Sequence, residues 1–409
     1  MRQVGVNIND KIRGSLMAGA AGDALGYAVE FKKFKDITSH YGGRGITQFE
    51  LNERGKAEIS DDTQMTLFTA NGLLMGLTRG AMRGIGGMPE DYVQFAYMDW
   101  YRTQCGVKEH AADHTWLVKL PEMACHRAPG GTCLNACKAL ISGKAVENDS
   151  KGCGGIMRVA PHALLSASYN QQGRLIYSPQ MIAKAGGIVA EVTHKHPLGF
   201  LPAALLNVFV YKVAQLTVEQ VQRDIEALVM ESLAIMDFAY RGKYRNARQY
   251  IRELTYKALN LARANLSDVE AIAQLGGGWV AEETWAIALY ATVRHIDSVE
   301  EAIIAAVNHD GDSDSTGAVA GYIMGAIYGF DHINRRNIFC PRGRRLEHTL
   351  ELSEIILALA DDLTSGCIIS EWEPRDTPEK QRWFARYCEM YPAGIGGSPI
   401  NPYDDAVLR

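Results

Sequence analysis

The 409-residue sequence has few cysteines, little net charge and no long apolar run. Its 8 cysteines include no CxxC pair, which is typical of reduced thiols in a cytoplasmic protein and excludes a dense disulfide framework. No apolar run reaches the roughly 18 residues of a membrane span, and residues 1–10 are too polar for a signal peptide. A net charge of -5 gives no bulk attraction to nucleic acid. We therefore predict a cytoplasmic protein that binds neither nucleic acid nor membrane.

Strand patterns are also missing. No segment alternates apolar β-branched residues between turn signals, which argues against a doubly wound α/β enzyme. Helical periodicity instead runs from a helix capped by Asp10 to the end of the helical region near residue 364. The other predicted helices are 63–77 (ended by Gly80), 92–104, 180–193, 201–215, 218–240, 245–265, 281–293, 299–307, 316–329 and 349–364. We predict an all-α protein with one compact domain over 10–370 and an irregular tail, 371–409, whose aromatic residues pack on the domain.

Two of the predicted helices begin with clusters of carboxylates and hydroxyls, at 60–63 and at 309–316. A Ser or Asp at a helix start is a normal cap, because its oxygen accepts a hydrogen bond from a free backbone N–H. Capping accounts less well for five aspartates at two helix starts. Mg²⁺ and similar ions prefer carboxylate and hydroxyl oxygens, so the pattern favours a metal site while capping stays open.

Small residues recur every four positions on two of the helices. The residues on one face of the helix after the second cluster are Gly317, Gly321, Gly325 and Gly329, and those with the same spacing in the first helix are Ala18, Gly22 and Gly26. Each glycine disfavours a helix by about 1 kcal/mol relative to alanine, so close packing on these faces is the expected compensation. We predict that the two helices press together at the centre and bring both carboxylate clusters near each other.

A zinc site is the alternative metal site. It would use the cysteines and histidines between 110 and 137, where His110 and His114 share one helix face. The cysteine spacings in this region match no common zinc motif. The residues in question are His110, His114, Cys125, His126, Cys133 and Cys137.

Six segments in order resemble the ADP-ribosylglycohydrolases, a family that includes dinitrogenase reductase-activating glycohydrolases and the arginine- and serine-ADP-ribose hydrolases. Together they reach from the first helix to about residue 330, which is most of the chain. Two of them, 60–63 and 311–315, have a serine (Ser60 and Ser315) where family members often have Thr; both residue types have a hydroxyl. The segments are 22–26 with Glu30, 60–63, 152–158, 193–197, 277–283 and 311–315.

The resemblance implies an all-α fold with a cleft that holds two divalent cations, Mg²⁺ or Mn²⁺. The implied metal ligands are Ser60, Asp61, Asp62, Asp312, Asp314 and Ser315. The general base would be one of Asp62, Asp314 and Glu30. The implied ADP-ribose contacts are Gly152, Cys153, Gly154, Gly155, Met157, Arg158, His194, Gly278 and Trp279, with Arg158 adding charge near the diphosphate.

The implied function is metal-dependent removal of ADP-ribose from modified protein side chains, with arginine as the favoured linkage. The partners are then an ADP-ribosylated protein as substrate and ADP-ribose as product. Such an enzyme would reverse an endogenous modification or protect against an ADP-ribosylating toxin. Two alternatives stay open: an inactive relative that binds ADP-ribose or a partner, and an enzyme of the same fold that acts on ADP-ribosylserine or another glycoside. The motifs do not encode an oligomeric state.

Overall fold

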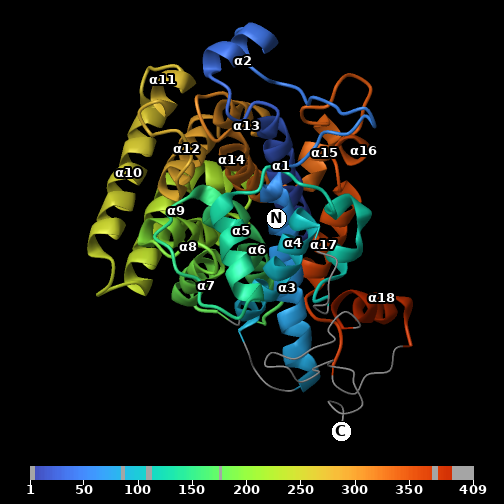
Figure 1. Ribbon diagram of the computed structural model, residues 1–409. Coiled ribbons are helices and arrows are strands. Elements are labelled where there is room, and N and C mark those ends of the chain that lie inside the picture. The colour runs from blue at the N-terminus through green and yellow to red at the C-terminus, as the bar shows by residue number, and fades with distance from the viewer. Residues whose placement is uncertain (1–4, 84–87, 107–112, 175–176, 371–375, 389–409) are drawn as a thin grey trace.

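A computed structural model describes residues 5–83, 88–106, 113–174, 177–370 and 376–388, and these residues form a helical protein (Figure 1). In the described ranges the only β-type pairing consists of two isolated bridges, Ala57–Leu350 and Gly152–Val280. The all-α prediction is therefore confirmed. None of the described helices is long and apolar enough to cross a membrane.

The helices have the following bounds. They are α1 (Ile8–Tyr27), α2 (Phe34–Tyr41), α3 (Asp61–Arg83), α4 (Val93–Cys105), α5 (Gly131–Ile141), α6 (Ala160–Gln171), α7 (Pro179–Glu191), α8 (Pro197–Val213), α9 (Val218–Ala239), α10 (Arg245–Arg263), α11 (Asp268–Ile272), α12 (Ala281–Arg294), α13 (Val299–Val307), α14 (Ser313–Tyr328), α15 (Phe330–Arg336), α16 (Leu346–Thr349), α17 (Ser353–Ser365) and α18 (Pro378–Tyr387). Four short 3-10 helices are η1 (Pro89–Tyr92), η2 (Trp116–Lys119), η3 (Pro121–Met123) and η4 (Cys153–Arg158).

Helices α1 and α14 form the centre of the protein, with α9–α12 on one side and α15–α18 on the other (Figure 1). They run antiparallel, because Gly14 faces Gly325, Gly22 faces Gly317 and Gly26 faces Ser313. A Cβ built on Gly317 would lie 2.5 Å from the Gly22 carbonyl oxygen, so the two backbones touch. The predicted packing of the glycine faces is confirmed. It places the C-terminal end of α1 beside the N-terminal end of α14.

Several helix boundaries differ from the prediction. Helix α3 continues through Gly80 to Arg83, because Met82 is buried and its packing outweighs the low helix propensity of one glycine. The region predicted as 349–364 is divided, since Leu352 has a positive φ of 57° between α16 and α17. Helix α6 was not predicted; most of its residues are buried, so it lacks the polar face that gives a helix its periodic pattern.

The C-terminal segment is not wholly irregular as predicted, because α18 lies within it. The side chains of Trp383, Phe384 and Tyr387 are buried. The Trp383 indole N–H donates a 3.0 Å hydrogen bond to Thr78 of α3. The domain boundary at residue 370 remains a prediction.

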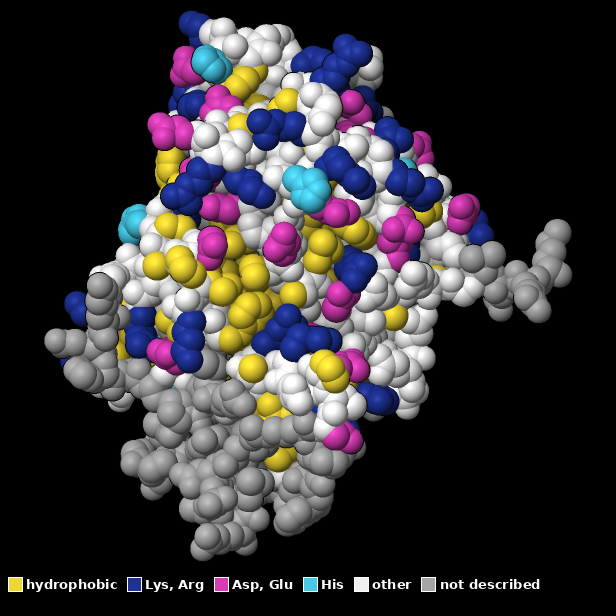
Figure 2. Space-filling model, turned by 90° about the vertical axis from the view of Figure 1, so that its right-hand side faces the viewer, with side chains coloured by type: hydrophobic (Ala, Val, Ile, Leu, Met, Phe, Trp, Pro, Cys, Tyr) yellow, Lys and Arg dark blue, Asp and Glu magenta, His cyan; other side chains and the backbone are white. Residues whose placement is uncertain are grey.

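The outer face beside α15–α17 carries both signs of charge. Figure 2 shows lysines and arginines interspersed with acidic side chains on this face, around a smaller apolar area. In the described part of this face, neither sign forms a large continuous field.

Candidate functional site

The N-terminal end of α3 carries the first carboxylate cluster. The Ser60 hydroxyl accepts a 3.1 Å hydrogen bond from the Asp62 backbone N–H, which is ordinary helix capping. The Asp61 backbone N–H donates to the Arg127 carbonyl at 3.0 Å, and Asp61 Oδ2 accepts a 3.4 Å hydrogen bond from the Gly130 N–H. Ser60, Asp61 and Asp62 are all buried, so capping by Ser60 leaves two buried carboxylates to be explained.

Asp23 of α1 holds this end of α3 in place. Its carboxylate accepts hydrogen bonds of 3.0 and 3.1 Å from the Ser60 backbone N–H and of 3.0 Å from the Thr63 N–H. It also accepts a short hydrogen bond from the Thr63 hydroxyl. Asp23 belongs to the 22–26 segment, but the sequence analysis did not predict a role for this residue. Because both carboxylate oxygens of Asp23 accept these hydrogen bonds, Asp23 stabilises the start of α3.

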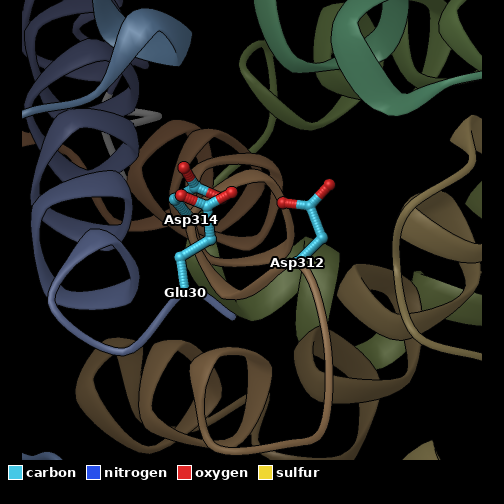
Figure 3. A group of neighbouring side chains, drawn as sticks. All are labelled: Glu30, Asp312 and Asp314. Atoms are coloured by element: carbon cyan, nitrogen blue, oxygen red, sulfur yellow. The ribbon is translucent and has the colours of Figure 1, made fainter. Parts of the chain in front are cut away.

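The second cluster begins α14. The Ser315 backbone N–H is shared between Asp314 Oδ1 at 2.9 Å and Asp312 Oδ1 at 3.3 Å. Carboxylate oxygens of Glu30, Asp312 and Asp314 all lie within 4.8 Å of one another. Figure 3 shows Glu30 and Asp314 side by side, with Asp312 turned toward the same space. This spacing is short enough for one cation to contact all three residues.

Burial and mutual repulsion disfavour ionisation of these acids. Burial, followed by the charge of Asp314, raises the pKa of Glu30 to about 9. The same two causes raise the pKa values of Asp61, Asp62 and Asp312 well above the ordinary range. Asp62 Oδ2 is buried and has no hydrogen-bond partner. A hard divalent cation fits this group of mutually repelling carboxylates and the unpartnered oxygen of Asp62, because it would supply the missing counter-charge.

The acids line a cavity of about 340 Å³, and much of the expected ADP-ribose loop lines the same cavity. Its lining brings together most residues that the sequence assigned to the site. Those lining residues are Glu30, Asp61, Asp62, Gly152, Cys153, Gly154, Met157, His194, Trp279, Asp312, Asp314 and Ser315. A larger hollow of about 880 Å³ lies beside Arg127, but it contains none of these residues, so size alone does not identify the site.

Four assigned residues lie outside this lining. Ser60 is the helix cap described above. A Cβ on Gly155 would lie 2.8 Å from the Gly199 carbonyl, so this glycine serves close packing. Gly278 has a positive φ of 81°, and its N–H donates to Glu283 Oε2 at 3.2 Å, which shapes the turn before α12.

Arg158 is the fourth, and its position differs from the expectation. Its side chain is fully buried behind the glycine loop, with the guanidinium carbon 4.3 Å from the centre of the Tyr97 ring. One terminal nitrogen donates to Cys133 Sγ at 3.4 Å, and the other donates to the Thr193 hydroxyl. The expectation that Arg158 adds charge beside a diphosphate is therefore corrected: the side chain is buried among protein groups. The sequence motif alone could not reveal this position.

Two exposed aromatic rings lie at the mouth of the cavity, and the sequence predicted a site role for only one of them, Trp279. Phe31 and Trp279 stack with ring centres 5.2 Å apart and planes 25° from parallel. Their exposed fractions are 70% and 42%, unusual for large aromatic residues. Phe31 also has a positive φ of 64°, a backbone conformation that costs energy for a non-glycine residue. The only signal for Phe31 in the sequence was its place next to Glu30.

The zinc alternative receives no support from the described residues. His110 lies outside them, and His114 Nδ1 is 3.3 Å from the Asp99 carboxylate. Cys133 contacts Arg158, and burial raises the pKa of the Cys137 thiol. Within the described ranges, the metal-type grouping found is that of Glu30, Asp312 and Asp314.

In this all-α scaffold, the carboxylates at two helix starts lie beside a glycine-rich loop in one cavity. The chain matches the ADP-ribosylglycohydrolase family over residues 5–369, and it belongs to this family of glycosyl-hydrolysing enzymes. This result confirms the family resemblance and the prediction of an enzyme.

Individual relatives agree with this assignment. The chain is 24% identical over 336 residues to the ADP-ribosyl-[dinitrogen reductase] glycohydrolase of Rhodospirillum rubrum. This match covers 80% of this chain and 89% of the relative. The chain is 27% identical over 212 residues to the human ADP-ribosylhydrolase ARH3, covering 48% of this chain and 54% of that protein. The chain thus spans about half the length of this human relative. A solved ADP-ribosylglycohydrolase-related protein complex has a TM-score of 0.48 and 22% identity, covering 88% of this chain and 98% of its own.

Proposed function

We propose that the protein is a metal-dependent hydrolase that removes ADP-ribose from modified arginine side chains of proteins. The observation that carries the proposal is the cavity that joins five buried or half-buried acids to the glycine loop and His194. The acids provide ligands for cations, and the loop provides a narrow, glycine-lined wall against which a diphosphate fits. The relatives named above act on ADP-ribosylated substrates, which supports the same substrate class.

Two cations, Mg²⁺ or Mn²⁺, would be held between the starts of α3 and α14. Asp61 and Asp62 are the proposed ligands from α3, and Asp312 and Asp314 those from α14, with the Ser60 and Ser315 hydroxyls beside them. When bound, the cations would lower the pKa of a water molecule and hold ribose hydroxyls. One of Glu30, Asp62 and Asp314 is the proposed general base, which would accept the proton of the attacking water.

The aromatic pair favours arginine over serine as the linkage. Phe31 and Trp279 both line the cavity and both are exposed at its mouth. A planar guanidinium stacks on aromatic faces and gains cation–π attraction, whereas a serine side chain offers neither a plane nor a charge. The leaving side of the substrate would therefore meet a surface suited to arginine.

The test is release of ADP-ribose from an ADP-ribosylarginine protein and, in parallel, from an ADP-ribosylserine peptide. Each substrate is incubated with Mg²⁺, with Mn²⁺ and with EDTA. We expect metal-dependent release that is faster from arginine and is lost in Asp62→Ala and Asp314→Ala. Release from neither substrate would contradict the hydrolase and favour a binding protein. Faster release from serine would overturn the linkage, and full activity of both variants would overturn the metal ligands.

A further inference from the structure

A row of buried polar groups runs from Arg158 to the cavity. Arg158 of η4 donates a hydrogen bond from Nη2 to the hydroxyl of Thr193, which follows α7. The same hydroxyl oxygen lies 2.8 Å from Nδ1 of His194. Arg158 and Thr193 are fully buried and His194 is 2% exposed, so water does not compete for these hydrogen bonds. The three side chains therefore form a fixed chain of contacts.

The hydrogen-bond donors and acceptors along this row indicate the tautomer of the His194 imidazole, that is, which ring nitrogen carries the proton. A guanidinium has only donors, so the Thr193 oxygen accepts from Arg158 and has one proton of its own to give. Of the neighbouring acceptors, His194 Nδ1 is at 2.8 Å and is a much stronger acceptor than the nearby sulfur of Cys133. The Thr193 proton therefore goes to Nδ1. In a neutral ring the remaining proton must then be on Nε2.

The ring is held neutral by its surroundings. Burial first, and then the positive charge of Arg158, lower the pKa of His194 to about 3. A protonated ring would also remove Nδ1 as the acceptor of the Thr193 proton. The neutral form with the proton on Nε2 gives the Thr193 proton its strongest nearby acceptor, whereas a proton on Nδ1 would leave only the weakly accepting sulfur of Cys133 for it.

Nε2 of His194 faces the cavity. His194 belongs to the lining, and Nε2 has no hydrogen-bond partner among the described residues. A Cβ placed on Gly152 would lie 3.3 Å from Nε2, and one on Gly154 would lie 3.4 Å from it. The two glycines thus keep the space beside Nε2 free of side chains. A nine-tenths buried donor without a partner faces a space that a ligand can enter.

We propose that Arg158 and Thr193 are positioning residues that fix His194 in the Nε2–H form, so that it donates a hydrogen bond to an acceptor atom of a bound ADP-ribose unit. The ligand named here rests on the proposed function, whereas the form of His194 does not. Because the donor is oriented before the ligand arrives, binding does not have to pay for turning or deprotonating the ring. Arg158 acts through Thr193 and does not itself touch the ligand.

The experiment compares Thr193→Val, which keeps the shape but removes the hydroxyl, with Thr193→Ser, which keeps the hydroxyl. Nitrogen NMR of ¹⁵N-histidine-labelled protein reports which ring nitrogen carries the proton, and a His194→Gln variant assigns the signal among the 11 histidines. Calorimetry measures the affinity for ADP-ribose in the presence of Mg²⁺. The matched control is Thr255→Val, which removes an equally buried hydroxyl on α10.

We expect the Nε2–H form in the wild type, in Thr193→Ser and in Thr255→Val. In Thr193→Val the signal should move to a mixture of both neutral forms, and Kd for ADP-ribose should rise about 5- to 10-fold, as expected for one lost hydrogen bond. A wild type with the proton on Nδ1 would overturn the proposal, as would a Thr193→Val variant with unchanged form and affinity. A wild type with the Nε2–H form that does not bind ADP-ribose would refute the ligand and the proposed function, and would leave the positioning by Arg158 and Thr193 standing.

Discussion

Asp23 accepts hydrogen bonds from the backbone N–H groups of both Ser60 and Thr63, so a single buried carboxylate joins α1 to the start of α3. On a neighbouring face of α1, Gly22 and Gly26 touch the start of α14. Helix α1 is therefore the part that sets the distance between the two acidic helix starts. Any cation held between them depends on residues of α1 that need not touch the cation.

Replacement of Asp23 by Asn should disturb this link. The amide group of Asn brings its own donors to a place where three donors already converge, so at least one buried N–H loses its partner. We expect the free energy of unfolding to fall by about 1–3 kcal/mol and Mn²⁺ affinity to fall with it. Urea unfolding and a Mn²⁺ titration measure the two effects. Asp36→Asn, on the exposed face of α2, is the control, and equal behaviour of both variants would contradict the role of Asp23.

Removal of cations should make the acids destabilising. The folded-state pKa values of Glu30, Asp61, Asp62 and Asp312 lie above their ordinary values, so the folded protein binds protons that the unfolded chain has released. The stability of the cation-free protein is therefore greatest below about pH 4 as far as these groups are concerned, and falls as the pH rises toward the folded pKa values.

Asp62→Asn tests this balance at pH 8. Removing one buried charge should stabilise the protein in EDTA by about 1–4 kcal/mol, because its Oδ2 has no partner to lose. The same variant should gain little from added Mg²⁺, whereas the wild type gains strongly. Thermal unfolding with EDTA and with Mg²⁺ gives both values. A variant less stable than the wild type in EDTA, and equally stabilised by Mg²⁺, would speak against a cation site at Asp62.

The sequence predicted those parts of the fold that leave a periodic or clustered pattern. The glycine spacing predicted the contact between α1 and α14, since each glycine at four-residue intervals has a partner across the interface. The acidic helix starts predicted the metal-type cluster at Asp312 and Asp314. The role of Asp23 depended on a contact across 37 residues of chain, and no local pattern indicates such a contact.

Arg158 shows why a motif does not determine the direction of a side chain. It follows the glycine loop directly in sequence, yet η4 turns it away from the cavity and onto Tyr97. Phe31 shows the converse, because it combines an exposed ring with a positive φ, and the sequence reveals neither of them. Helix α6 was missed for a third reason: burial on nearly all sides removes the periodic pattern on which the prediction depends.

The close contact of α1 and α14 predicts a severe effect of one methyl group. In Gly317→Ala the new Cβ would lie 2.5 Å from a carbonyl oxygen of α1, and backbone cannot yield as a flexible side chain can. We expect a loss of about 3 kcal/mol or more in the free energy of unfolding, at the upper end for overpacking. Urea unfolding measures it, and Gly43→Ala is the control because open space surrounds that position. Similar stability of both variants would show that the helices can move apart.

His194 should contribute to acid sensitivity. Its folded pKa of about 3 is below the unfolded value near 6.5, so between these values the unfolded chain binds a proton that the folded protein does not. Stability from this group is therefore present above about pH 6.5 and is lost as the pH falls. Between pH 7 and pH 5, His194→Gln should lose about 2 kcal/mol less than the wild type. Urea unfolding at both pH values checks this difference, and parallel losses would mean that the pKa of His194 is the same in the folded and unfolded states.

The last prediction concerns Phe31 at the mouth of the cavity. If its ring faces the guanidinium of the substrate, Phe31→Leu keeps an apolar side chain but removes the attraction of an aromatic face for a cation, worth roughly 1 kcal/mol. KM for an ADP-ribosylarginine protein should rise about 5-fold, while inhibition by free ADP-ribose, which has no guanidinium, should stay within about twofold. Phe238→Leu, an exposed phenylalanine on α9, is the control. An equal change in KM and in inhibition would instead place Phe31 against the ADP-ribose unit, because only contacts with the leaving side separate the two measurements.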